Sequence, residues 1–122
     1  MKLNIFFYLF IAAIMVSCAN TENNKHIIGK WVGVEWVVNG SPSNQNPKET
    51  HFIFDDQGNY TFTYAGVVEK GTYNVENEML FTKPAEQQEI MVRISKLSKD
   101  SLIFDMNRGG QPETLVLIRD KP

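Results

Sequence analysis

The stretch FIFDDQGNYTF, residues 52–62, carries the pattern that decides the fold. On each side of its centre, aromatic side chains recur at every second position, which is the period of a β-strand with one buried face. The centre itself, Asp55–Gly58, is rich in Asp and Gly, which tolerate the positive φ angles of tight hairpins. The stretch therefore predicts two antiparallel strands joined by a short turn.

The same pattern continues along the chain in both directions. Short alternating or β-branched runs are broken by turn residues every eight to twelve positions or so, which is typical of an all-β sandwich or barrel. The predicted strands are 30–38, 49–54, 59–66, 68–75, 79–82, 88–97, 101–106 and 113–119. Only Asn39–Lys48 is a long connection, and it predicts a surface loop over one end of the sheet.

The alternation gives this predicted sheet one apolar face. A flat sheet would expose that face and leave two unpaired edges. Closure into a barrel buries the face and pairs the first strand with the last. We therefore expect an all-β fold, an eight-stranded antiparallel up-and-down barrel.

The first residues predict export and anchoring. Lys2 precedes a charge-free apolar run, Ile5–Val16, which is shorter than the roughly 20 residues of a membrane-spanning helix. The single cysteine, Cys18, follows Ser17 at the expected cleavage point, and residues 15–18 resemble the lipobox of bacterial lipoproteins. These features predict a lipoprotein signal peptide at 1–17, a lipidated Cys18 with a flexible tether at 18–26, and a barrel domain at 27–122. The alternative is a secreted protein with a free thiol.

The order of short motifs resembles the lipocalin-like domain lipoproteins of Gram-negative bacteria. Gly29-Lys30-Trp31 matches the Gly-x-Trp signature of the first strand, FIFDDQGNYTF matches the strand, hairpin and strand that follow, and LVLIRD ends the barrel with the expected basic residue. The resemblance implies a calycin-like barrel in the cell envelope, facing the periplasm or the cell surface. It also implies that Trp31 closes one end of the barrel beneath Arg119. The short strands favour a shallow barrel.

Two hypotheses concern the interior. An eight-stranded barrel is just wide enough to be filled by its own side chains or to hold one small ligand. In the first hypothesis, a shallow cup holds a small apolar or amphiphilic molecule, with Phe62 and Phe104 as its floor and Tyr64 and Glu35 as its rim. In the second, the aromatic side chains fill the barrel, and the protein is a structural or interaction lipoprotein without a small-molecule ligand.

Composition and motifs argue against several other function classes. The chain has 12 Lys and Arg against 14 Asp and Glu, and no basic run, which argues against nucleic acid as a partner. The two histidines, His26 and His51, lack the neighbours of a metal site and are expected at the surface. No nucleophile with a base and no glycine-rich phosphate loop is present. The sequence therefore predicts a protein that is not an enzyme and has no metal or cofactor, with the membrane as its partner through Cys18.

Overall fold

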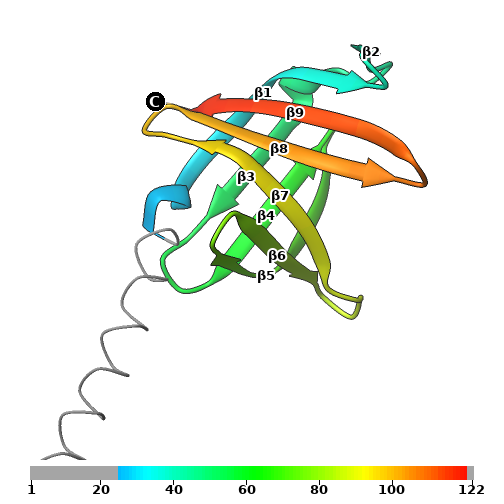
Figure 1. Cartoon of the computed structure of the whole chain (residues 1–122). Coiled ribbons are helices and arrows are strands. Elements are labelled where there is room, and N and C mark those ends of the chain that lie inside the picture. The colour runs from blue at the N-terminus through cyan, green and yellow to red at the C-terminus, as the bar shows by residue number, and fades with distance from the viewer. Residues whose placement is uncertain (1–24, 121–122) are drawn as a thin grey trace, which may run out of the picture.

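The computed structural model describes residues 25–120, which form one closed antiparallel sheet (Figure 1). Eight strands follow one another around the barrel, and the last pairs with the first. They are β1 (Gly29–Val38), β3 (Thr50–Phe54), β4 (Asn59–Tyr64), β5 (Val67–Glu76), β6 (Met79–Pro84), β7 (Ile90–Leu97), β8 (Ser101–Arg108) and β9 (Gln111–Arg119). The predicted all-β up-and-down barrel is confirmed.

The long connection between β1 and β3 contains two short elements. The two-residue strand β2 (Ser41–Pro42) pairs with the end of β1, and the 3-10 turn η1 (Pro47–Glu49) leads into β3. A Cβ on Gly33 of β1 would collide with the Pro47 carbonyl, so the missing side chain lets η1 pack closely against β1. The predicted surface loop is therefore partly ordered against the barrel.

Strand ends differ from the predicted ones by a few residues. Ala65 and Gly66 both have positive φ, 49° and 85°, and so form the tight β4–β5 turn rather than the end of a strand. At the other side of the barrel, β8 and β9 extend to the turn at Gly109 and Gly110, where φ is again positive. In both cases the backbone conformation of the turn sets the strand boundary.

The pairing of β1 with β9 closes the barrel. At the end of the barrel where β1 begins, the Arg119 guanidinium covers the Trp31 ring. Trp31 lies directly opposite Arg119 in the ladder, and the Arg119 guanidinium carbon lies 3.9 Å from the centroid of the Trp31 ring. Trp31 is fully buried and its indole Nε1 donates to the Ile27 carbonyl at 2.8 Å. A guanidinium stacked on indole is favourable by about 0.5 to 2 kcal/mol.

Arg119 also ties separate segments together through backbone carbonyls. Its Nη1 donates to Ile28 at 2.6 Å, its Nη2 to His26 at 3.3 Å, and its Nε to Lys99 at 3.1 Å. Gly29, with a φ of 133°, has no Cβ where the Arg119 guanidinium lies. The conformation and the space both require glycine, which explains the first residue of the Gly-x-Trp signature.

The core extends along the barrel from Trp31 to Trp36 and Leu115. Fully or almost fully buried side chains there include Phe54, Leu102 and Leu117. The aromatic residues expected to point inward all belong to this core or pack against it: Trp31, Phe52, Phe54, Tyr60, Phe62, Tyr64, Tyr73 and Phe104. Tyr73 lies toward the Trp31 end of the barrel and donates its hydroxyl to the Asp55 carbonyl in the β3–β4 hairpin.

The predicted signal peptide, Cys18 and the tether up to Asn24 lie outside the described residues. The described chain begins with a helical turn at residues 25–27, so the last two residues assigned to the tether belong to this turn. Between residues 25 and 120, no helix combines the length and apolar character needed to cross a membrane.

Replacement of Trp31 by Ala should destabilise the barrel by roughly 3 to 5 kcal/mol, because it empties a fully buried site. Arg119→Ala should cost less, and its cost should shrink by roughly 0.5 to 2 kcal/mol in a Trp31→Ala background, where the ring is gone. Urea denaturation of the four proteins measures both effects. Lys30→Ala, an exposed neighbour, is the control, expected to change stability by at most about 0.5 kcal/mol. Additive effects of the Trp31 and Arg119 changes would contradict the proposed coupling.

Candidate functional site

The two ends of the barrel differ in how well their interiors are filled. The N-terminal turn and the end of β9 lie at one end, whereas the β8–β9 hairpin lies at the other (Figure 1). At the hairpin end, called the open end below, several inward apolar side chains are only partly buried: Val38, Phe62, Tyr64, Val92 and Met106. These apolar side chains therefore keep part of their surface exposed.

Aromatic rings form the floor beneath these side chains. Phe104 is 2% exposed, and the Phe52 ring lies 5.5 Å from it and 4.7 Å from the Phe62 ring, measured between centroids. Phe62 and Phe104 thus belong to one cluster of contacting aromatic rings. Phe52 joins them, although it was not among the predicted site residues.

Glu35 does not belong to the rim, and its predicted position is wrong. In the pairing with β9, Gly33 lies opposite Leu117 and Glu35 opposite Val116, so Val34 is the extra residue of a β-bulge. Beyond this bulge the alternation is shifted by one position, which leaves Glu35 exposed outside the barrel. Strict alternation from Trp31 fails because it assumes an uninterrupted strand.

Trp36 takes the inward position expected for Glu35. It is 9% exposed, and its ring packs edge-on against Tyr64, with a centroid distance of 6.0 Å and an interplanar angle of 89°. The observed aromatic rim is therefore Trp36 with Tyr64.

A buried carboxylate lies beside Trp36. Glu113 on β9 is 9% exposed, and its Oε1 accepts a hydrogen bond from Trp36 Nε1 at 3.2 Å. Its Oε2 lies 3.0 Å from Nε of Arg108, whose side chain is largely exposed. The charge of Glu113 is therefore balanced by Arg108. These side chains and residues 42–45 line a pocket of about 330 Å³ at the open end.

A second carboxylate points into the barrel from β5. Glu69 lies opposite Phe62 in the β4–β5 ladder and is partly buried, whereas its neighbours Val68 and Lys70 are exposed. Its Oε2 accepts a hydrogen bond from the Tyr60 hydroxyl at 3.0 Å. Sequence reasoning missed Glu69, although it shares the parity of Tyr73 and Val75 on the same strand.

Tyr60 connects this carboxylate to the core. It is 3% exposed, and its burial, together with the hydrogen bond and the negative charge of Glu69, raises its pKa well above the usual range. The Thr82 side chain forms a further hydrogen bond with Tyr60. Tyr60 therefore stays protonated and donates to Glu69 at all physiological pH values.

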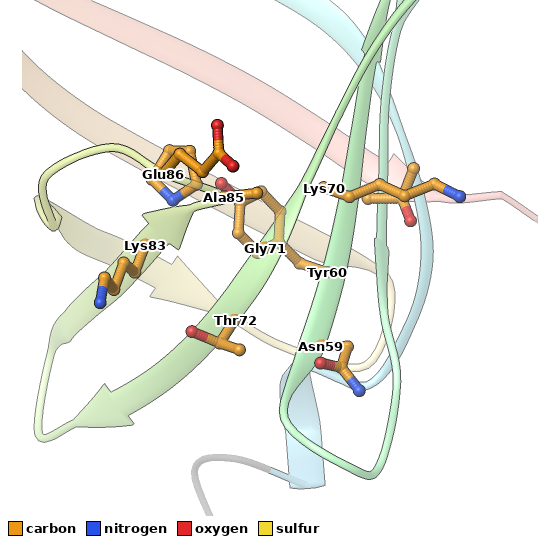
Figure 2. Close-up of a pocket in the computed structure, with 10 residues that line it drawn as sticks. Asn59, Tyr60, Lys70, Gly71, Thr72, Lys83, Ala85 and Glu86 are labelled. Carbon is orange, nitrogen blue, oxygen red and sulfur yellow. The ribbon is translucent and has the colours of Figure 1, made fainter.

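Another hollow, of about 510 Å³, lies along β4, β5 and β6 (Figure 2). Its polar side chains do not converge on a common point. Lys83 and Thr72 extend to one side of the hollow, and Lys70 and Asn59 extend to the opposite side (Figure 2). This arrangement cannot surround one ligand group, so the open end of the barrel is the better candidate site.

Comparison with known proteins gives the family. A family model described as a lipocalin-like domain matches residues 27–104, which is most of the chain. The chain belongs to this lipocalin-like family. The match begins at Ile27, the buried residue whose carbonyl accepts from Trp31, and ends at Phe104 on the floor of the site.

Solved structures share the fold of this lipocalin-like barrel. A lipocalin-like protein from Bacteroides uniformis has 13% sequence identity and a TM-score of 0.56, over 79% of this chain and 99% of that one. An uncharacterized protein from Bacteroides eggerthii has 12% identity and a TM-score of 0.58, over 76% of this chain and 98% of that one. No curated protein matches the chain.

The histidines lie away from the site in this lipocalin-like barrel. His26 is exposed in the N-terminal turn, and His51 is partly buried between two inward residues of β3. Within residues 25–120, no three His, Cys, Asp or Glu side chains are grouped closely enough to hold a metal ion. The chemistry of the open end is therefore that of aromatic surface, hydroxyl groups and carboxylates.

Replacement of Arg108 by Ala should destabilise the domain by about 1 kcal/mol, because Glu113 would keep a buried charge without its cation. A second change, Glu113→Gln, should restore most of this loss, since the amide oxygen can still accept from Trp36 Nε1 without carrying charge. Chemical denaturation near pH 7 measures both. An Arg108→Ala protein that is further destabilised by Glu113→Gln would contradict this account.

Proposed function

We propose that this protein is a lipid-anchored binding module of a Gram-negative cell envelope, and that its shallow barrel holds a small amphiphilic molecule. The observation that carries the proposal is the incomplete burial of inward apolar side chains at the open end, Phe62 and Met106 among them. By contrast, Leu102 and Leu117 are fully buried.

The chemistry of the open end favours an amphiphile over a purely apolar ligand. Small-molecule sites combine apolar walls with a few placed polar groups that orient the ligand. Here the aromatic floor of Phe52, Phe62 and Phe104 would take an apolar portion. The carboxylate of Glu69, opposite Phe62 in the β4–β5 ladder, would face a polar group.

The position of the chain start is compatible with an anchor at Cys18. The described chain enters the barrel at the closed end, beside Trp31 and Arg119, so the open end points away from the point of attachment (Figure 1). Seven residues, 18–24, can span at most about 25 Å. An anchored domain would thus sit near the bilayer surface with its open end accessible to ligand.

A second function is favoured by the exposed apolar side chains of the open end. Val67 and Val68 at the start of β5 are 73% and 54% exposed, and Ile90 and Met91 at the start of β7 are 49% and 60% exposed. Such side chains would suit contact with another envelope protein. In that case the barrel would be a scaffold without a small-molecule ligand, as the second hypothesis states.

The folded domain, residues 25–122, should bind Nile red, a neutral dye that fluoresces in apolar surroundings, with a Kd of tens of micromolar, or about −6 kcal/mol. Phe62→Trp should weaken this binding because the larger ring fills the open end. Ile118→Trp adds the same ring at an exposed outward position and serves as the matched control. Fluorescence titration measures the affinities. Absence of binding to the wild-type domain would favour the scaffold function.

Cys18→Ala should release the protein from the membrane fraction of its host or leave the signal peptide uncut. Each buried methylene of an acyl chain contributes about 0.8 kcal/mol, so loss of the acylated residue removes the anchor. Thr21→Ala, three residues further on, should leave fractionation unchanged. Membrane fractionation and the mass of the mature N-terminus test both variants. A Cys18→Ala protein that is correctly processed and still membrane-bound would overturn the anchor.

A further inference from the structure

We infer that the ligand of this barrel carries a positively charged, hydrogen-bond-donating group, such as an ammonium, and that Glu69 is the residue that recognises it. The inference rests on the proposed binding function and names the class of molecule bound. It starts from the charges inside the barrel. The carboxylates of Glu69 and Glu113 point inward, and in the described part of the chain only Glu113 has a cation partner.

Glu113 is the balanced carboxylate. Arg108 lies 3.0 Å from one of its oxygens, and Trp36 donates to the other at 3.2 Å. Both of its oxygens therefore have a positively polarised neighbour. The negative charge of Glu113 thus already has a cation, although Oε2 accepts no hydrogen bond within residues 25–120.

Glu69 is not balanced in this way. Glu69 belongs to neither of the ion pairs seen in residues 25–120 between Arg93 and Glu78 and between Arg108 and Glu113. Its single hydrogen bond in this part of the chain comes from a neutral donor, the Tyr60 hydroxyl. A carboxylate has room for about four donors, so Glu69 can accept several more.

The position of Glu69 directs the remaining hydrogen-bond acceptor sites of its carboxylate toward the proposed ligand. Phe62 lies directly opposite it in the ladder and is partly exposed to the open end. A carboxylate beside an apolar surface gains more from a cation than it would in bulk water, because the local dielectric constant is lower. An amphiphile with its chain over Phe62 would bring its head group within reach of Glu69.

Tyr60 acts here as a positioning residue. It is buried, and its hydroxyl donates to Oε2 of Glu69 at 3.0 Å. The hydroxyl therefore restricts the orientation of the carboxylate before any ligand binds, which reduces the entropy lost on binding. Oε1 of Glu69 is left to accept from the ligand.

The test compares two probes with the same number of carbon atoms and opposite charge, dodecylamine and dodecanoate. Isothermal titration calorimetry at pH 7 and low salt, below the micelle concentrations, gives the two affinities for the domain. Dodecylamine should bind about tenfold more tightly or better, since a charge-assisted hydrogen bond forms only with the ammonium. Glu69→Gln, which keeps the size of the side chain, should reduce this preference to about twofold or less.

Two further variants distinguish recognition by Glu69 from a general effect of net charge. Glu35→Gln removes an exposed carboxylate from the outside of the barrel, so it makes the same change in net charge and should keep the full preference for dodecylamine. Glu69→Lys should reverse the preference in favour of dodecanoate. Both positions are at least partly exposed, and unchanged denaturation midpoints would establish that the variants are folded.

The outcomes separate this inference from the function on which it rests. If neither probe nor Nile red binds, the binding function fails and the inference fails with it. If both probes bind equally, if dodecanoate binds better, or if Glu69→Gln keeps the preference, the barrel binds ligands but the assignment to Glu69 is overturned. A preference that Glu35→Gln abolishes equally well would also overturn it, because long-range charge would then explain the selectivity.

Discussion

The pairing of β1 with β9 is the contact on which the rest of the structure depends. Without it, the sheet would have two free edges and an exposed apolar face. The pair Trp31 and Arg119 lies at the end of this ladder, and Arg119 reaches the carbonyls of His26, Ile28 and Lys99. One side chain thus joins the N-terminal turn, the last strand and the β7–β8 hairpin. At the closed end, the Arg119 guanidinium and its hydrogen bonds cover the buried Trp31 indole.

Closing one end so completely leaves the interior asymmetric. Trp31, Phe54 and Leu117 are fully or almost fully buried, whereas several side chains near the β8–β9 hairpin are only partly buried. In the proposed function, stability and binding are assigned to different halves of the barrel. Changes at the open end can alter the ligand without removing the contacts that close the sheet.

The two inward carboxylates illustrate how neighbours decide the role of the same functional group. Glu113 is neutralised by Arg108 and held by Trp36, so it is a structural element of the rim. Glu69 is held only by the Tyr60 hydroxyl and lies beside Phe62 without a cation partner among residues 25–120. An uncompensated charge next to apolar surface is costly unless a ligand or water meets it. This difference makes Glu69, rather than Glu113, the residue that would distinguish between ligands.

The sequence by itself determined the local features of the protein. Period-two alternation and turn residues such as Asp55–Gly58 gave strands, hairpins and the inward aromatic residues, because these depend on neighbours in the chain. Only the tertiary structure decided which polar side chains lie at the candidate site. The bulge at Val34 replaces Glu35 by Trp36, and the cross-strand register brings Glu69 to Phe62 and Tyr60. A bulge and a register are properties of two paired strands, and the periodicity of one strand does not contain them.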